Sequence, residues 1–346
     1  MVTQLLDQGD HVGSPQRIST MRAIQFHQFG SVEELYLGDF PTPEPAAHEI
    51  RVKVKATALN RADLLQREGK YPPPAGESPI IGLEISGMVE KLGEKATKWK
   101  IGDRVCGLLA GGGYAEYAVL HEDVAMPIPE NLDFLAAAAI PEAFLTAFQA
   151  LVWIAQLKAG ETLLIHAGAS GVGTAALQLA RLIGARAFVT ASAEKHALCL
   201  ALGAEQCIDY KTQDFAECIQ EWTKGRGVDV VLDFLGASYL ERNLKSLAMD
   251  GRMVMLAIMG GAQADGINLG MVLMKRLSIH GSTLRARTLR YKTELTQAFM
   301  DLAWGHFSSG ALFPVVDKVF SWEDVAQAHL YMEENRNQGK VVLGVQ

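Results

Sequence analysis

The segment TLLIHAGASGVGTAALQLA, residues 162–180, decides the fold of this chain. Residues 162–166 are apolar and short, as expected for a buried strand, and residues 174–183 have the pattern of a helix. Small residues between them let the backbone turn tightly and approach a pyrophosphate, whose charge a helix N-terminus stabilises. The segment therefore predicts a strand, a phosphate-binding loop and a helix. The loop residues expected to contact the phosphates are Gly168, Ser170, Gly171, Val172 and Gly173.

The loop departs from the usual pattern G-x-G-x-x-G, because Ser170 occupies the second glycine position. A glycine-rich turn without a ligand is the alternative interpretation. The context favours the ligand, since the loop follows a strand, begins a helix and heads a regular alternation of strands and helices. This spacing predicts βαβ crossovers and a doubly wound parallel sheet in an α/β fold. The further strands are expected at residues 186–190, 206–209, 228–233, 252–257 and 278–281.

Residues 22–128 have a different pattern, with short β segments separated by turns rich in glycine and proline. Residues 50–56 alternate apolar and basic side chains, which is typical of a half-buried strand. An irregular, barrel-like β domain is the interpretation, interrupted by one helical stretch at residues 62–67. An alanine-rich helix is expected at residues 135–156. The segments after residue 285, including a final strand at residues 340–344, are expected to return to the β domain.

The composition excludes several classes of protein. Of the 346 residues, 49% are hydrophobic and 21% are charged, which excludes disorder as the main state. A net charge of −7 argues against a nucleic-acid binder, and no apolar run is long enough to span a membrane. Residues 1–20 resemble neither a signal nor a transit peptide and are interpreted as a disordered extension or a tag. Cys106, Cys199, Cys207 and Cys218 form no C-x-x-C pair, which indicates reduced thiols and a cytoplasmic location.

The end of the second strand distinguishes NAD from NADP. An acidic residue there would bind the ribose 2′-hydroxyl of NAD, whereas the 2′-phosphate of NADP needs cations and small donors. Thr190 and Ser192 leave this strand end without a carboxylate, and Lys195 can supply positive charge. Glu194 is the contrary residue, although at a helix start it can simply favour the helix dipole. The segment favours NADP(H) as cofactor, with a solvated helix face as the alternative for Lys195.

Six further stretches of the sequence are distinctive. They are ALNRAD (58–63), YPPP (71–74), GLEISG (82–87), GDRV (102–105), PEAFLTA (141–147) and HAGASGVG (166–173). Together these motifs resemble the medium-chain dehydrogenase/reductase superfamily, specifically its zinc-free quinone oxidoreductase branch and the p53-inducible type within it. The resemblance implies a GroES-like catalytic domain at residues 21–143 and 286–346 and a Rossmann NADP-binding domain at residues 144–285. It also implies a homodimer or homotetramer, joined through edges of the Rossmann sheet.

Zinc-dependent relatives in this superfamily carry a cysteine before the first helix and a histidine before a glutamate. Here Asn60 lies near the first position and Leu83 replaces the histidine. No histidine forms a spaced cluster with cysteine, so no metal is expected. His166 is expected to be a buried, hydrogen-bonded structural residue. Without a Lewis acid to stabilise an alkoxide, the preferred acceptor is a quinone or another conjugated carbonyl, whose reduction gives a delocalised anion.

Two residues are the candidates for catalysis. Asn60 can donate an amide hydrogen bond to substrate or cofactor, or it can be the N-cap of the helix at residues 62–67. Tyr71 precedes three prolines, and its phenol can orient a carbonyl or relay a proton. An exposed loop aromatic is the alternative for Tyr71, and the family resemblance favours the substrate role.

The resemblance also implies contacts with the cofactor. Thr146 matches the family position beside the nicotinamide, with a hydroxyl bonded to its own helix as the alternative. Gly236 and Gly260 follow strands at the edge where a nucleotide should pass. Leu284 is expected near the nicotinamide. The other positions carried over are Asn60, Ser192, Lys195, Tyr210, Ser238 and Asn337.

These observations predict NADPH-dependent reduction of a quinone in a cleft between the domains, without metal, nucleic acid or membrane. An alkenal or enoyl double-bond reductase on the same scaffold is the first alternative. An NADPH sensor or partner-binding protein with little turnover is the second.

Overall fold

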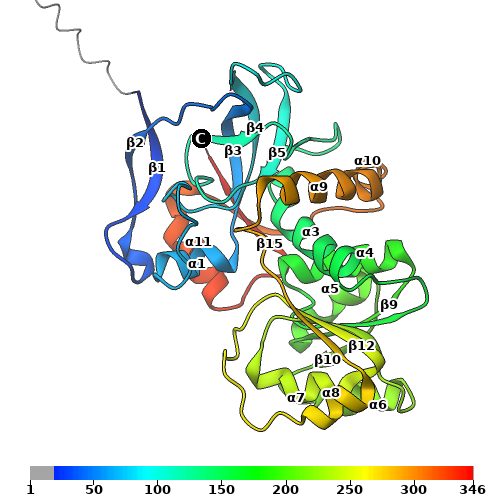
Figure 1. Ribbon diagram of the computed structural model, residues 1–346. Coiled ribbons are helices and arrows are strands. Elements are labelled where there is room, and N and C mark those ends of the chain that lie inside the picture. Colours follow the sequence, from blue (N-terminus) through cyan, green and yellow to red (C-terminus); the bar gives the residue numbers. More distant parts are fainter. Residues whose placement is uncertain (1–18, 346) are drawn as a thin grey trace, which may run out of the picture.

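The computed structural model describes residues 19–345 in two packed units (Figure 1). The predicted extension at residues 1–20 lies outside the described residues except for its last two, and Thr20 already begins strand β1 (Thr20–Phe26). This early start has a simple cause, because β1 pairs along its whole length with β2 (Leu35–Pro41).

A six-stranded sheet forms the unit that contains the phosphate loop. All its pairs are parallel and its order is β10-β9-β8-β11-β12-β13, which is the doubly wound order expected for a Rossmann fold. Its strands are β8 (Thr162–Ile165), β9 (Arg186–Ala191), β10 (Ala204–Asp209), β11 (Val228–Asp233), β12 (Leu247–Met255) and β13 (Ser278–Gly281).

Helices cover both faces of this sheet because its strands are apolar on both sides. Leu163 and Ile165 of β8 belong to one buried cluster, which includes side chains of α3 and α4, while Leu164 belongs to another with α6. The helices of this unit are α4 (Gly171–Ile183), α5 (His196–Ala201), α6 (Phe215–Trp222), α7 (Ala237–Ser246) and α8 (Leu269–Lys275).

A seven-stranded sheet forms the core of the GroES-like unit. Six strands follow the order β14-β15-β3-β4-β5-β7, and β6 pairs with β3. The pair β14·β15 is parallel and the other pairs are antiparallel. The strands are β3 (Glu49–Ala58), β4 (Glu84–Leu92), β5 (Arg104–Leu108), β6 (Tyr117–His121), β7 (Ala125–Pro127), β14 (Val316–Ser321) and β15 (Lys340–Gly344).

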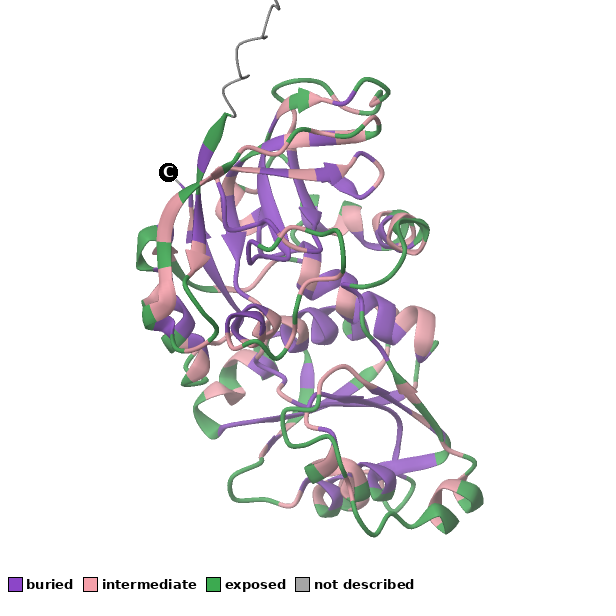
Figure 2. Cartoon of the chain, turned by 60° about the vertical axis from the view of Figure 1, so that its left-hand side comes forward, coloured by how far each residue is buried: buried purple, intermediate pink, exposed green. Residues whose placement is uncertain are grey.

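The C-terminal segment therefore joins the sheet of the N-terminal segment. Val342 of β15 pairs with Ala58 of β3, although 284 positions separate them in the sequence. Helix α11 (Val325–Glu333) lies beside α1 (Arg61–Arg67) on the same unit (Figure 1). Figure 2 shows that the strands of both sheets are largely buried and that exposed residues concentrate in the loops.

The helix expected at residues 135–156 is divided in the structure. Its parts are α2 (Phe134–Ala137), α3 (Pro141–Phe148) and a π-helical turn (Gln149–Ile154). Pro141 begins α3 because proline lacks the N–H that would continue an earlier helix. Residues 134–154 are apolar and long enough to cross a membrane, but 72% of their most apolar window is buried inside the protein. This is the pattern of a core helix, and it is weak evidence for a membrane span.

Two further α-helices and one π-helical turn lie between β13 and β14 in the sequence. They are α9 (Leu289–Phe299), continued by a π-helical turn (Met300–Trp304), and α10 (Gly305–Ser308). Phe299 and Phe307 of this region pack against Phe144 of α3. The remaining short elements are 3-10 turns at Val32–Glu34, Ala193–Lys195 and Trp322–Asp324.

Candidate active site

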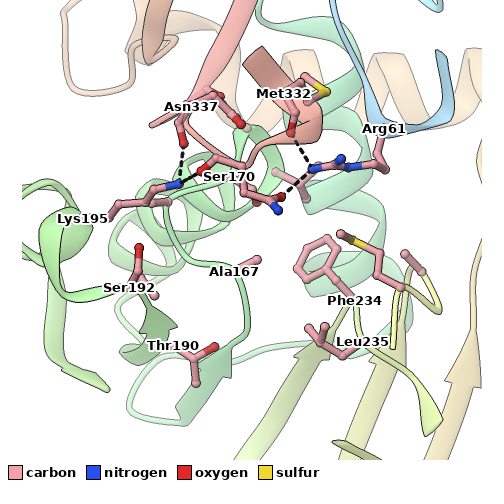
Figure 3. A pocket seen from close by; sticks show the side chains of 18 of the residues that line it. Arg61, Ala167, Ser170, Thr190, Ser192, Lys195, Phe234, Leu235, Met332 and Asn337 are labelled. Carbon is pink, nitrogen blue, oxygen red and sulfur yellow. Dashed lines mark hydrogen bonds between the residues drawn. The ribbon is translucent and has the colours of Figure 1, made fainter. Parts of the chain in front are cut away.

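A cleft of about 340 Å³ lies at the carboxyl ends of β8, β9 and β11, where parallel sheets of this type bind ligands. The GroES-like unit closes it with residues that precede α1 and β15. The predicted cofactor residues that line it are Asn60, Ser170, Gly171, Val172, Ser192, Lys195, Tyr210 and Asn337. Figure 3 shows side chains from both units around this space.

The phosphate loop forms one wall of the cleft. Helix α4 begins at Gly171 rather than at the predicted Thr174, because Ser170 is its N-cap and its hydroxyl accepts a hydrogen bond from the Gly173 N–H at 3.0 Å. The residue at the second glycine position therefore caps the helix. Gly171 and Val172, the first two residues of α4, line the cleft, and a helix N-terminus at this place suits an anion.

Two glycines of the loop are needed for its close packing. A Cβ on Gly168 would lie 2.6 Å from the Cβ of Val189, and one on Gly173 would lie 2.4 Å from the carbonyl oxygen of Ala167. Neither residue lines the cleft, so these glycines shape the loop from behind. Ala167 has a φ of 49°, a left-handed conformation that turns the chain towards the helix.

Lys195 faces the C-terminal loop of the other unit. Its ammonium group donates hydrogen bonds to the carbonyl oxygens of Asn335 at 2.6 Å and Asn337 at 2.8 Å (Figure 3). Burial lowers its pKa, with Glu194 and Asp317 opposing this effect. Lys195 is thus held at the cleft, and the alternative of a solvated helix face is wrong.

The contrary residue of the cofactor prediction, Glu194, has a local partner. The Ser192 hydroxyl donates a 2.6 Å hydrogen bond to its carboxylate, which lowers the pKa of Glu194. Glu194 does not line the cleft, whereas Thr190, Ser192 and Lys195 do.

Two basic residues that line the cleft were not identified from the sequence. Arg61 donates hydrogen bonds to the Met332 carbonyl at 3.2 Å and to the Asn335 side chain at 2.8 Å (Figure 3). Lys340 begins β15 and is almost fully buried. Arg61 could have been found from the sequence, because it directly follows Asn60 at the start of the first helix. Lys340 could not, because it lies 280 positions away from Asn60 and only the fold brings the two residues together. With Lys195, the lining holds three cations and no carboxylate.

Asn60 is the N-cap of α1, as the alternative interpretation proposed, and it also lines the cleft. Its amide NH₂ donates to a Glu84 carboxylate oxygen at 2.9 Å, and its amide oxygen accepts from the Lys340 ammonium at 2.6 Å. Lys340 and Glu84 form a buried ion pair of 2.7 Å. This network fixes both atoms of the Asn60 amide, so Glu84 and Lys340 orient it.

Two more acidic groups lie around this network. Burial raises the pKa of Asp63 to about 7, and burial together with Glu84 raises the pKa of the partly buried Glu142 to about 7. The Thr146 hydroxyl donates to the Glu142 carboxylate at 3.3 Å. Thr146 thus bonds within its own helix, as the alternative interpretation expected, but to a side chain and not to a backbone carbonyl. Thr146 does not line the 340 Å³ cleft.

Tyr71 and Leu284 lie beyond the lining of this cleft. Tyr71 is half-buried, burial raises its pKa, and the Arg285 guanidinium carbon lies 5.3 Å from the centre of its ring. Leu284, the neighbour of Arg285 in the sequence, is buried. Tyr71 is therefore not simply an exposed loop aromatic.

Two of the remaining predicted residues, Ser238 and Gly260, line a second cleft of about 430 Å³. A Cβ on Gly260 would lie 2.0 Å from the Ser238 hydroxyl oxygen. Gly236 has a φ of 71° and precedes α7, and its N–H donates to Asp233 at 2.9 Å. Gly236 lines neither cleft, and none of these three residues lines the first one.

His166 is a structural residue, as predicted. It has no exposed surface, and its ring nitrogens lie 3.0 Å from the Thr190 hydroxyl and 2.7 Å from the Asn243 side-chain oxygen. Burial lowers its pKa to about 4, so its ring is neutral at pH 7.

The donor set does not fit a zinc ion. Within residues 19–345, no group of three or more His, Cys, Asp or Glu side chains lies close enough to hold a metal. Leu83 offers no ligand atom, and the carboxylate of Glu84 already binds the Lys340 ammonium and the Asn60 amide.

Two family models match the chain. Residues 46–130 match the alcohol dehydrogenase GroES-like domain, and residues 171–303 match the zinc-binding dehydrogenase domain. A quinone oxidoreductase of Mus musculus is 34% identical over 314 residues, which cover 89% of this chain and 93% of that protein.

Solved structures show the same fold over nearly the whole chain. The CurK enoyl reductase has a TM-score of 0.85 and 29% identity, covering 95% of this chain and all of that one. A mycobacterial protein complexed with NADPH has a TM-score of 0.83 and 29% identity, covering 94% of this chain and 99% of that one. On the match of both domains and the identity to quinone oxidoreductases, this chain belongs to the medium-chain dehydrogenase/reductase superfamily of oxidoreductases.

Proposed function

We propose that this protein reduces quinones with NADPH in the cleft between its two units. The observation that supports this most is the lining of the 340 Å³ cleft, which combines the side chains of Arg61 and Lys195 and a helix N-terminus with no carboxylate. Such a lining suits a polyanionic dinucleotide, and Lys195, in the turn after β9, suits the additional phosphate of NADP. The net negative charge of the protein does not oppose this binding, because the positive groups lie at the cleft itself. The bound cofactor supplies the hydride.

The residues around Tyr71 support a conjugated acceptor. The side chains at the site do not fit a zinc ion that could act as a Lewis acid. The charge that develops on the substrate oxygen must therefore be stabilised by hydrogen bonds and fixed charges. Tyr71 offers a phenolic donor beside the Arg285 guanidinium. A quinone places this charge on a delocalised, aromatic product and therefore needs less stabilisation than a simple ketone. Metal-independent reduction is part of this proposal.

Steady-state oxidation of NADPH and NADH tests the proposal across ortho- and para-quinones, 2-alkenals and enoyl-CoA, for wild type and Tyr71→Phe. We expect turnover with NADPH and quinones and a lower kcat/KM in Tyr71→Phe. Activity with no quinone would refute the quinone assignment. A preference for NADH would refute the NADP assignment.

The alternative of an enoyl or alkenal reductase is favoured by the likeness to the CurK enoyl reductase. It requires a proton donor for the α-carbon, and the same substrate panel distinguishes it. A sensor would bind NADPH tightly and turn over none of these acceptors.

The proposal includes a cytoplasmic homodimer, with a homotetramer as the alternative. Strand β13 lies at the edge of the six-stranded sheet, and the neighbouring α8 exposes apolar side chains. Leu269, Leu273 and Met274 are each more than 70% exposed. An open strand edge beside an apolar surface is suited to pairing with a second copy.

A further inference from the structure

The loop at residues 71–79, here named the tyrosine loop, begins with Tyr71 and has little support of its own. Residues 72–74 are prolines and donate no backbone hydrogen bond. Inside the loop the structure has one backbone hydrogen bond, from Glu77 N–H to the Pro74 carbonyl at 3.1 Å. The position of Tyr71 must therefore be set by groups outside the loop.

Side chains bind the carbonyl oxygens at both ends of the loop. Arg285 donates to the Tyr71 carbonyl at 3.2 Å, and Gln66 donates to the Pro79 carbonyl at 2.9 Å. The two side chains are themselves joined, because Arg285 donates to the Gln66 side-chain oxygen at 2.6 Å. A third donor of Arg285 binds the Ala110 carbonyl at 2.7 Å. One guanidinium thus connects both ends of the loop to the core of the GroES-like unit.

The environment of Arg285 is unusual for an arginine. Its exposed fraction is 5%, and no carboxylate of residues 19–345 lies within 4.0 Å of its guanidinium. Neutral oxygens and the face of the Tyr71 ring contact the guanidinium, while the carboxylates of Asp63, Glu142 and Glu77 act on it only from a greater distance. Because burying a charge without an ion-pair partner in contact is costly, this arrangement calls for a role other than simple packing.

Arg285 also belongs to the segment that crosses from the Rossmann sheet. It follows β13 and adjoins Leu284, the predicted neighbour of the nicotinamide. This segment is held to the helix extension after α3, since Gln149 donates to the Thr283 carbonyl at 3.4 Å and accepts from the Ser282 hydroxyl at 3.2 Å. Arg285 is therefore the link between the crossing segment and the tyrosine loop.

We propose that Arg285 is a positioning residue, whose forked hydrogen bonds to Tyr71, Gln66 and Ala110 hold the tyrosine loop against the core of the GroES-like unit. The substrate role of Tyr71 in this inference rests on the proposed function. The geometry requires a planar group with several donors, which arginine has and lysine lacks.

Hydrogen–deuterium exchange of the peptide spanning residues 65–80 tests the positioning directly, without substrate. The variants are Arg285→Met and Arg285→Lys, and the matched control is Arg287→Met. Arg287 is exposed, donates to the Thr283 carbonyl at 3.2 Å and stacks on Tyr291 instead. We expect exchange about tenfold faster in both Arg285 variants and unchanged in Arg287→Met.

Gln66→Met provides a second approach, should Arg285→Met fold poorly. It removes the connection to Pro79 and one acceptor of Arg285, while the Arg285 bonds to Tyr71 and Ala110 remain, so exchange near Pro79 should again be faster. Unchanged exchange in Arg285→Lys and Gln66→Met would overturn the proposal. Full protection in Arg285→Lys would mean that charge alone suffices and that the fork has no role.

Steady-state kinetics with the quinone panel supply the functional measurement. In Arg285→Lys we expect KM for quinone to rise roughly tenfold to a hundredfold, while the Kd of NADPH, measured by fluorescence, changes less than about threefold. An equal loss of both affinities would indicate general damage and would overturn the positioning role. If the wild type reduces no quinone, the proposed function fails, yet the exchange experiment still decides whether Arg285 holds the loop.

Discussion

Asp63 is a buried carboxyl group whose chemistry depends on its neighbours. One of its oxygens accepts hydrogen bonds from the Asn60 N–H at 2.7 Å and the Tyr114 hydroxyl at 3.3 Å, while the other has no partner within the described residues. Burial raises its pKa to about 7, against the opposing effects of the Asn60 hydrogen bond and Lys340.

The raised pKa predicts a specific pH dependence of stability. In the unfolded chain Asp63 ionises near pH 4, whereas the folded protein keeps the proton up to about pH 7, so its contribution to stability is lost as pH rises across this window. In Asp63→Asn this loss is absent. The unfolding free energy of the variant, relative to wild type, should therefore rise by on the order of 3 kcal/mol between pH 4 and pH 8.

Urea unfolding at pH 4, 6 and 8 measures this difference. Asp250→Asn is the control, because the exposed Asp250 pairs with Arg276, which lowers its pKa. Its relative stability should change with pH in the opposite direction. A constant difference between wild type and Asp63→Asn would contradict the prediction.

Single residues were predicted in part. Ser170 was expected in the phosphate loop and lines the cleft, but its role as N-cap of α4 was not predicted, because the expected helix began only at Thr174. Glu84 and Lys340 were not identified as site residues. Their importance comes from a buried ion pair that joins β4 to β15, and no short sequence window contains both.

At the scale of elements, the strand–loop–helix unit holds the most information. Gly173 is the residue with the least space in this unit, since a Cβ would meet two backbone carbonyl oxygens, at 2.4 Å and 2.7 Å. Backbone atoms cannot move aside as a flexible side chain can. The loop must therefore shift if this residue gains a side chain.

Gly173→Ala should weaken NADPH binding at least about tenfold and cost roughly 1–3 kcal/mol of stability. Gly305→Ala is the matched control, because a Cβ there meets no atom within 4 Å, and it should change neither property. Fluorescence titration with NADPH and thermal unfolding measure the two effects. Normal NADPH affinity in Gly173→Ala would show that the loop does not form the phosphate site.

The elements themselves were mostly predictable, because alternating strands and helices carry strong hydrophobic patterns. The boundaries were less so. Helix α4 begins three residues earlier than expected, and the long alanine-rich helix is divided at Pro141. In both cases a capping or helix-initiating residue decided the boundary, and the hydrophobic pattern does not report it.

At the scale of the whole molecule, the open edge of the six-stranded sheet predicts self-association. Leu273 is 75% exposed on α8, and Ile279 is 45% exposed on the edge strand β13. If the proposed dimer forms through this edge, Leu273→Glu and Ile279→Lys should shift it towards monomer, because a charge buried in an interface lacks a partner. Ile101→Lys is the control, since Ile101 is 70% exposed on the other unit.

Sedimentation velocity measures the masses of wild type and variants. A monomeric wild type would contradict the dimer, and a tetramer in which neither variant has an effect would place the interface elsewhere.

The phosphate loop, its strand and its helix are determined by the sequence itself, because turns, caps and hydrophobic periodicity act over a few residues. The same reason explains why the absence of a carboxylate at the end of β9 was visible from residues 189–195. The arrangement of charge in the cleft was decided only by the tertiary structure. Arg61, Lys195, Lys340 and the Arg285 link come from segments up to 279 positions apart, and burial, which changes their interactions most, exists only once both units pack together.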